Sequence, residues 1–389
     1  MTPDALRIAL FSGNYNYVRD GANQALNRLV DFLLRQGAHV RVYSPMVEHP
    51  AFPPTGDLVG VPSLAIPGRD EYRIPLALTS KARRDLAEFA PNIVHIASPD
   101  FVAHRAVSWA RARGIPAVAS VHTRFETYLQ YYHLQSLEPA VRAILRRLYR
   151  RCDAIVAPAE STAAILRAQR MNRHISIWSR GVDRDQFNPE RRSPEFRRAH
   201  GIGDDDMAVA FLGRLVLEKG LDVFVDVIDA GRAAGVPMKV LVIGDGPARG
   251  WFAERMPGAA FTGQLTGAEL AIALASADVF LNPSITEAFG NVTQEAMACA
   301  LPVVAAAATG ANSLVVDGVS GVLVAPDDLD GFAEALAIYQ RDAALRARHG
   351  AAGLAFAKTR DWDEINGAVM RFYQQVIERR ARLQRKRGR

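Results

Sequence analysis

Two glutamates stand eight residues apart in the segment Glu287-Ala-Phe-Gly-Asn-Val-Thr-Gln-Glu295. The segment follows an apolar run typical of a strand, and it leads into a run typical of a helix. Gly290, at the start of that helix, lets the backbone come close to a ligand. The free N–H groups of the first turn favour an anion, and Glu295 can bind a vicinal diol, as in a sugar or a ribose. The alternative is a helix start whose acidic residues suit the helix dipole.

A pair of cations lies in the same half of the chain, in Gly213-Arg-Leu-Val-Leu-Glu-Lys-Gly220. Arg214 and Lys219 flank a turn between a predicted strand and a predicted helix. An arginine binds a phosphate bidentately and a lysine binds it as a point charge, so the pair suits a pyrophosphate. The spacing alone is weak evidence, and it becomes strong in combination with the two glutamates.

A tight turn, Ile243-Gly-Asp-Gly-Pro247, ends another predicted strand. It lacks the Gly-x-Gly-x-x-Gly fingerprint of dinucleotide sites, which disfavours a dehydrogenase. Gly244 is either at the rim of a base or ribose site or part of a bare turn.

No Asp-x-Asp metal motif lies in a suitable loop, and the run 204–206 is interpreted as a solvated turn. Cys152 and Cys299 lie in apolar settings and predict buried thiols. We therefore expect no metal and no cofactor.

The elements that must position these residues alternate between strand and helix patterns, twice over. The strands predicted in the first half are 7–11, 40–43, 93–96, 117–121, 154–157 and 175–178. Those predicted in the second half are 209–212, 240–243, 260–262, 279–281, 303–305 and 322–324. This alternation predicts an α/β protein with two Rossmann-like, doubly wound parallel sheets covered by helices.

We place an N-terminal domain at residues 1–182 and a C-terminal domain at 183–360, with a terminal helix and basic tail at 361–389. The helix is expected from about Asp363 to Arg382. Because ligands bind beyond the carboxyl ends of parallel strands, two facing units predict a site in the cleft between them.

The composition is that of a folded chain without a membrane span. Of the 389 residues, 49% are hydrophobic and 23% are charged, as in globular proteins. The first residues are polar and no apolar run is long enough for a leader or a spanning helix. We expect a cytoplasmic protein.

The formal net charge is +6, and one helix concentrates part of it. Between Val141 and Arg151, apolar residues are expected on one side, at Val141, Ile144, Leu145, Leu148 and Tyr149. The other side carries Arg142, Arg146, Arg147, Arg150 and Arg151. A basic amphipathic helix suits an anionic membrane surface, and the alternative is a solvated helix face. No aromatic residues for base stacking accompany the arginines, which disfavours nucleic acid.

These motifs resemble those of retaining GT-B glycosyltransferases. Glu287 with Glu295 matches their Glu-x7-Glu signature, and Arg214 with Lys219 matches their phosphate-binding Arg-x4-Lys. The run 179–183, Ser-Arg-Gly-Val-Asp, resembles their interdomain segment. The likeness covers nearly the whole chain. It is greatest to family 4, in the branch of GDP-mannose-dependent α-mannosyltransferases and sulfoquinovosyl-diacylglycerol synthases, on segments 61–73 and 120–126.

The resemblance implies roles for residues of the second half. Arg214 and Lys219 would hold the pyrophosphate of the donor, Glu295 the ribose hydroxyls and Glu287 the donor sugar. The N–H groups of three consecutive residues would complete the site, those of Phe289, Gly290 and Asn291. Retention of configuration follows from the family, and the arginine and lysine would replace a metal ion.

The resemblance also implies roles in the first half. His122 would face the donor sugar, its alternative being a hydrogen-bonded core histidine. Gly21 would let the backbone approach the diphosphate, although the loop from Gly13 to Gly21 is less glycine-rich than in many relatives. Arg124 and Glu126 are candidates for the acceptor side.

The function predicted from the sequence is transfer of a hexosyl group from a nucleotide sugar. GDP-mannose is the favoured donor and a UDP-sugar comes next. The acceptor is expected to be a membrane lipid, a glycolipid or a glycan, with the enzyme peripheral on the inner face of a membrane. Two alternatives stay open, namely a nucleotide-sugar 2-epimerase of the same fold and a non-enzymatic sugar-nucleotide or lipid-binding protein.

Overall fold

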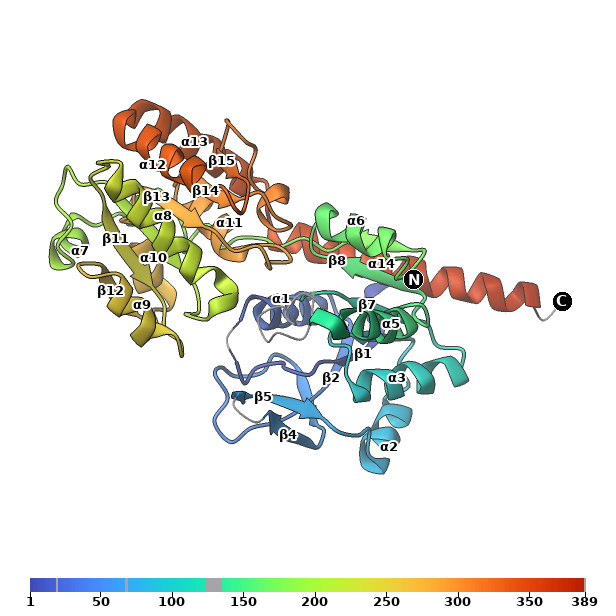
Figure 1. Ribbon diagram of the computed structural model, residues 1–389. Coiled ribbons are helices and arrows are strands. Elements are labelled where there is room, and N and C mark those ends of the chain that lie inside the picture. Colours follow the sequence, from blue (N-terminus) through green and yellow to red (C-terminus); the bar gives the residue numbers. More distant parts are fainter. Residues whose placement is uncertain (19, 67–68, 124–134, 388–389) are drawn as a thin grey trace. The chain divides into compact units, whose positions relative to one another are not determined.

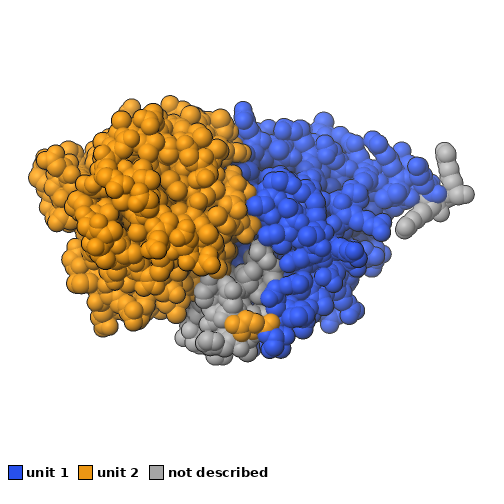
Figure 2. All heavy atoms as spheres, turned by 45° about the horizontal axis from the view of Figure 1, so that its top comes forward, with its two compact units in different colours: residues 1–126, 136–180, 362–389 blue, residues 127–135, 181–361 orange. Residues whose placement is uncertain are grey.

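The computed structural model describes residues 1–18, 20–66, 69–123 and 135–387. Two compact units divide the chain (Figure 2). Unit 1 takes its residues from the ranges 1–126, 136–180 and 362–389, and unit 2 takes its residues from 127–135 and 181–361. The C-terminal segment therefore belongs to the same unit as the N-terminus.

Unit 1 is built on a parallel sheet of seven strands in the order β3-β2-β1-β6-β7-β8-β9. The strands are β1 (Arg7–Phe11), β2 (His39–Ser44), β3 (Asp57–Gly60), β6 (Ile93–Ile96), β7 (Ala117–Ser120), β8 (Ala154–Ala157) and β9 (Ile175–Ile177). In the interior strand β1, Ala9 and Phe11 pack into one hydrophobic core, and Ile8 and Leu10 pack into another. The interior of the sheet is therefore buried on both faces, which is why strands such as β1, β6 and β8 are mainly apolar.

Helices cover the two faces of this sheet (Figure 1). They are α1 (Gly21–Arg35), α2 (Ser80–Phe89), α3 (Phe101–Ala112), α5 (Glu138–Tyr149), α6 (Glu160–Ala168) and α14 (Trp362–Arg387). Three of them begin at a side-chain N-cap, because the side chains of Asp20, Thr79 and Asp100 accept a hydrogen bond from the N–H group three residues ahead.

The last helix, α14, packs on α1. Asp363 forms an ion pair of 2.7 Å with Arg35, and the side chain of Asn366 donates to the carbonyl of Arg28. The helix reaches Arg387, so the predicted end at Arg382 was too early. The side chain of Gln384 donates to the carbonyl of Gly114, and this contact holds the basic end of the helix on the unit.

Three strands of unit 1 were missed by the sequence analysis. They are β3 and the two strands of an antiparallel hairpin, β4 (Ser63–Ile66) and β5 (Arg69–Pro75). β3 lies at the edge of the sheet, and its four residues are all exposed or half-buried. Each of the three strands is short or carries several polar residues, so none shows the longer apolar run by which the other strands were predicted.

Unit 2 repeats the plan with six parallel strands in the order β12-β11-β10-β13-β14-β15. The strands are β10 (Ala208–Leu212), β11 (Lys239–Ile243), β12 (Ala260–Gly263), β13 (Val279–Asn282), β14 (Val303–Ala306) and β15 (Gly321–Val324). The main helices are α7 (Pro194–Ala199), α8 (Leu221–Ala233), α9 (Arg249–Arg255), α10 (Gly267–Ala275), α11 (Asn291–Ala298), α12 (Leu329–Arg341) and α13 (Ala343–Lys358). The predicted α/β class with two parallel sheets is confirmed.

A buried ion pair closes the amino end of the unit 2 sheet. Arg197, in α7, donates to a carboxylate oxygen of Asp278 at 2.9 Å and to the carbonyls of Ser276, Gly203 and Asp206. Its side chain is only 2% exposed. The carboxyl ends of the strands form the opposite edge of the sheet, which is where parallel α/β units bind their ligands.

Candidate donor site

The acidic motif with Glu287 and the basic motif with Lys219 meet beyond the carboxyl ends of β10 and β13. The ammonium of Lys219 lies 2.9 Å from Oε1 of Glu287. The Glu287 side chain is 9% exposed and that of Lys219 is 33% exposed. A cation and a carboxylate, one buried and one reaching solvent, therefore share the edge of the sheet where ligands of parallel α/β units bind.

A polar pair from β13 and α11 holds Glu287 in place. The amide of Asn282, the last residue of β13, donates to Oε2 of Glu287 at 3.1 Å and to the hydroxyl of Thr293 at 2.9 Å. Both carboxylate oxygens of Glu287 thus have a donor. Sequence analysis missed Asn282, and the available signal was a polar residue at the end of an otherwise apolar strand.

Lys219 is positioned by a contact between two loops. It ends the short 3-10 helix η5 (Leu217–Lys219), and Gly220 follows with φ +72° against Pro283. The hydroxyl of Thr286 donates to the carbonyl of Glu218 at 2.8 Å. The β10–α8 loop is thereby tied to the loop that carries Glu287. Arg214 lies in the same β10–α8 loop and is half-buried.

Gly290 begins α11 in the left-handed conformation, with φ +98°. A Cβ atom at this position would stand 3.1 Å from Oε2 of Glu287. The glycine is therefore needed both for the backbone turn and for the room it leaves to the carboxylate. Phe289 is buried beside it and Asn291 is half-buried, and the binding role of these three residues stays a prediction.

Glu295 lies one turn beyond the start of α11 and is half-buried. Its charge acts on the next turn of the helix, where burial and then Glu295 raise the pKa of the Cys299 thiol to about 12. Cys299 therefore stays a neutral buried thiol, as Cys152 does, in agreement with the prediction.

Gly244 has a structural reason to be glycine. Its φ is +139°, and a Cβ there would lie 2.0 Å from the carbonyl oxygen of Gly213. The turn after β11 packs directly on the β10–α8 loop, where Leu215 donates its N–H to the carbonyl of Asp245 at 2.9 Å. The turn thus supports the loop of Arg214 and Lys219, and a contact of Gly244 with a base or ribose stays a prediction.

His122 follows β7 at the carboxyl edge of the unit 1 sheet, and it is half-buried. Its Nε2 is 2.7 Å from the hydroxyl of Ser120, and its Nδ1 is 2.8 Å from a guanidinium nitrogen of Arg180. Burial, the charge of Arg180 and then His95 hold the pKa of His122 well below its usual value. His122 is thus a neutral, hydrogen-bonded histidine in this unit. Arg180, which the sequence analysis did not single out, is its partner.

The other residues predicted in unit 1 are placed as follows. Gly21 is the first residue of α1, directly after the cap Asp20. Arg124 and Glu126 lie outside the described residues. At the end of β1, the N–H of Gly13 donates to Ser98 at 2.6 Å, so this loop is tied to the segment after β6.

Several arginines of the predicted basic helix face make contacts within unit 1 that the sequence analysis did not predict. Arg142 pairs with Glu138, while Arg146 and Arg150 donate from Nε to the carbonyls of Gln169 and Arg170 at 3.0 Å. Arg147 is exposed.

One residue of α5 contradicts the predicted core face. Ile144 is 57% exposed, whereas the other four predicted apolar residues, Val141, Leu145, Leu148 and Tyr149, pack into or against the core of unit 1. The error arose because the amphipathic pattern was taken one residue too wide. An exposed isoleucine next to an exposed arginine leaves a mixed apolar and basic surface.

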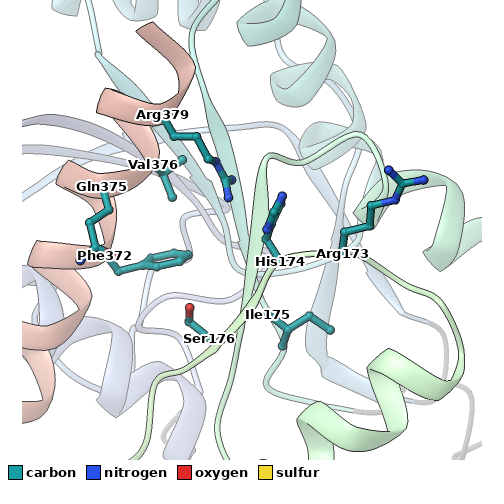
Figure 3. Close-up of a pocket in the computed structure, with 8 residues that line it drawn as sticks. All are labelled: Arg173, His174, Ile175, Ser176, Phe372, Gln375, Val376 and Arg379. Atoms are coloured by element: carbon teal, nitrogen blue, oxygen red, sulfur yellow. The ribbon is translucent and has the colours of Figure 1, made fainter. Parts of the chain in front are cut away.

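A shallow hollow of about 380 Å³ lies elsewhere on unit 1 (Figure 3). It is lined by Arg173, His174, Ile175, Ser176, Phe372, Gln375, Val376 and Arg379. Arg173 and His174 precede β9, so the hollow is at the amino end of that strand. None of the predicted site residues lines it.

Metal clusters and membrane-spanning helices are both absent from the described ranges. No cluster of three or more His, Cys, Asp or Glu side chains there could hold a metal ion. None of the helices in that part of the chain has the length and apolar character needed to cross a membrane.

Comparison with known proteins gives consistent matches in both halves. Residues 19–186 match the family model "Glycosyltransferase Family 4", and residues 206–342 match "Glycosyl transferases group 1". A GDP-mannose-dependent alpha-mannosyltransferase of Mycolicibacterium smegmatis is 33% identical over 97% of this chain and 99% of its own length. The sulfoquinovosyl transferase SQD2 of Arabidopsis thaliana is 31% identical over 92% of this chain and 71% of its own length.

Solved structures share the fold. A sucrose-phosphate synthase from Thermosynechococcus elongatus has a TM-score of 0.77 and 21% identity, covering 96% of this chain and 99% of its own. The Anabaena protein HepE, solved in complex with UDP, has a TM-score of 0.74 and 19% identity, covering 95% and 100%. At these identities the likeness concerns the architecture, which is that of GT-B glycosyltransferases.

Proposed function

Since this chain belongs to glycosyltransferase family 4, we propose that it moves a hexosyl group from a nucleotide sugar to an acceptor hydroxyl with retention of configuration. GDP-mannose is the favoured donor and a UDP-sugar the next candidate. The acceptor is a membrane lipid, a glycolipid or a glycan. The observation that carries the proposal is the contact of Lys219 with Glu287 at the carboxyl edge of the unit 2 sheet.

The chemistry of transfer explains why cations are needed at this edge. The bond from the sugar C1 to the diphosphate breaks, and C1 forms a bond to the acceptor oxygen, whose proton is released. Negative charge builds on the departing diphosphate, and fixed cations stabilise it. Arg214 and Lys219 would supply those cations from one loop, without a metal ion.

The carboxylates would recognise hydroxyl groups. Glu287, whose two oxygens are already aligned by Lys219 and Asn282, would accept hydrogen bonds from the donor sugar. Glu295 would bind the ribose diol. The first-turn N–H groups of α11, with those of Phe289 and Gly290, would bind the sugar or the phosphates, because such groups favour anions.

A thermal-shift panel tests the donor site. Wild-type protein is heated with GDP, UDP and ADP and with their common sugar conjugates, alongside Arg214→Ala. We expect one nucleoside diphosphate to raise the melting temperature of the wild type and to lose that effect in the variant. Arg232→Ala, in α8 at an exposed ion pair with Asp229, is the matched control and should keep the effect. Absence of stabilisation by every nucleotide would contradict a donor site.

Incubation of the stabilising nucleotide sugar without an acceptor tests the reaction itself. A transferase with its acceptor omitted should leave the donor largely intact, whereas an epimerase would convert it. The anomeric configuration of the transferred sugar, read by NMR, tests retention.

The surface of α5 supports a membrane-associated acceptor. Leu137 and Ile144 are 48% and 57% exposed, and Arg147 lies one helical turn beyond Ile144. Exposed apolar residues beside basic ones suit the boundary of an anionic bilayer. We expect flotation with vesicles containing anionic lipid, weakened in Ile144→Ser and kept in Val319→Ser, an equally exposed valine of unit 2. Equal behaviour of the two variants, or no flotation at all, would count against membrane docking.

A further inference from the structure

A line of hydrogen bonds runs through the interior of unit 1 to His122. Arg180 is 2.8 Å from Nδ1 of His122, and Nε2 of His122 is 2.7 Å from the hydroxyl of Ser120. The same hydroxyl is 2.8 Å from Nε2 of His95, whose Nδ1 is 2.7 Å from the hydroxyl of Tyr373 in α14. Arg180, His95, Ser120 and Tyr373 are all buried. The line therefore joins the C-terminal helix to a residue of the predicted site.

The hydrogen-bonding partners of His122 determine which of its ring nitrogens carries the proton. A guanidinium has only N–H donors, so the nitrogen that faces Arg180 must accept. Nδ1 of His122 then carries no proton, and the single proton of the neutral ring is on Nε2. The Nε2–H in turn donates to Ser120. Both ring nitrogens are thus engaged within unit 1.

Packing holds both partners in this arrangement. The guanidinium carbon of Arg180 lies 4.6 Å from the centroid of the Trp178 ring, and the ring of His122 meets the same tryptophan edge-on at 5.4 Å. Arg180 also donates to the carbonyls of Trp178 and Ser179. Burial lowers the pKa of Arg180 to about 9, so the guanidinium keeps its charge at neutral pH.

We propose that Arg180 is a positioning residue that holds His122 as the neutral Nε2–H tautomer with both ring nitrogens turned into unit 1. His122 then serves the reaction by its fixed position and not as a proton donor or acceptor. Arg180 ends the segment 136–180 of unit 1, and the long segment of unit 2 starts at Gly181, so the chain that leaves unit 1 is anchored on the histidine.

The first test is spectroscopic and does not depend on the proposed function. Full-length protein labelled with 15N at histidine is examined by long-range 1H–15N correlation, and the His122 signals are assigned from His122→Asn. We expect the pattern of a neutral Nε2–H tautomer at neutral pH. A doubly protonated ring or an Nδ1–H tautomer in the wild type would overturn the proposal.

Two variants separate Arg180 from Ser120. Arg180→Met removes the donor to Nδ1 and keeps an unbranched side chain over Trp178, so we expect a mixture of tautomers. Ser120→Ala removes the acceptor of Nε2–H but leaves the arginine, so we expect the Nε2–H tautomer to persist. The opposite pattern would show that Ser120, and not Arg180, decides the tautomer. If Arg180→Met does not fold, the spectra of the wild type and of Ser120→Ala still test whether His122 is held as the Nε2–H tautomer without Ser120.

The kinetic test rests on the proposed function, and it is made with the donor identified by the thermal-shift panel. We expect Arg180→Met to lower kcat by about 10²-fold through misplacement of His122, with the KM for the donor unchanged. Arg180→Lys, which keeps a charged donor, should recover part of kcat. Arg184→Met, an exposed arginine four residues later, is the control and should keep full activity.

The two tests fail separately. If His122 shows the Nε2–H tautomer but the protein transfers no sugar, the proposed function is contradicted and the tautomer assignment still holds. An active enzyme in which Arg180→Met raises only KM, or changes nothing, would overturn the positioning role.

Discussion

The ammonium of Lys219 lies 2.9 Å from a carboxylate oxygen of Glu287, although the two residues are 68 positions apart in the chain. A second donor, the amide of Asn282, holds the other carboxylate oxygen. One cation of the predicted phosphate site is thus aligned by a carboxylate of the predicted sugar site. A cation that the protein itself holds in position needs little reorganisation when charge develops on a leaving group.

Replacing Lys219 by methionine removes this cation while keeping an unbranched side chain. We expect sugar transfer to fall by roughly 10²–10³-fold, the effect of removing one preorganised electrostatic donor. Initial rates with saturating donor measure it. Lys239→Met, on an exposed residue at the amino end of β11, should retain the wild-type rate. A similar loss in both variants would mean that overall charge, and not this position, matters.

Replacing Gly290 by alanine should damage the site through the backbone. The left-handed conformation costs an alanine about 1–2 kcal/mol, and the new Cβ would stand 3.1 Å from Oε2 of Glu287. We expect a lower melting temperature and weaker nucleotide-sugar binding. Gly250→Ala, at the start of α9 with no atom within 4 Å of its added Cβ, should be neutral or slightly stabilising. If Gly290→Ala keeps the melting temperature and the nucleotide-sugar binding of the wild type, α11 can begin in another conformation.

Two adjacent arginines in α7 should differ strongly in their effect on stability. Arg197 is buried on Asp278, whereas the side chain of Arg198 is 59% exposed and 3.7 Å from Asp204. Removing one partner of a buried ion pair costs about 3–5 kcal/mol, while an exposed pair contributes about 0–1 kcal/mol. Urea unfolding of Arg197→Met and Arg198→Met should therefore show a large and a small loss. Equal losses would contradict the structural role of Arg197.

The buried histidine His95 should make unit 1 less stable in acid. Burial lowers its pKa from 6.5 to about 3, so below pH 6.5 the unfolded chain binds a proton that the folded unit does not. The stabilisation is complete above pH 6.5 and is lost as the pH falls towards 3. Between pH 7 and pH 5 the loss is roughly 2 kcal/mol.

Urea midpoints at pH 7 and pH 5 measure this loss. His95→Gln should be less stable at pH 7 but should depend less on pH. His39→Gln, at an exposed histidine, should show the slope of the wild type. A His95→Gln protein with an unchanged slope would assign the acid sensitivity to other groups.

Pattern reasoning succeeded where a residue's surroundings are reflected in its neighbours along the chain. Strands such as β6 and β8 were predicted with the bounds that the structure has, because they are buried on both faces and lie between polar turns. β3 is a four-residue edge strand in which only Leu58 and Val59 are partly buried, so its apolar run was too short to predict a strand. Ile144 was assigned to the core because periodicity gives the side of a helix but not the width of the buried stripe.

The sequence by itself determined the alternation of strands and helices, the two parallel sheets and the motifs of the candidate donor site, because these depend on local periodicity and on residue types at fixed spacing. Only the tertiary structure decided which side chains meet. The contact of Lys219 with Glu287 and the contact of Arg180 with His122 join segments that are 68 and 58 residues apart in the chain. Such contacts depend on the order of the strands in each sheet and on the packing of their loops, and the spacing of residues along the chain predicts neither.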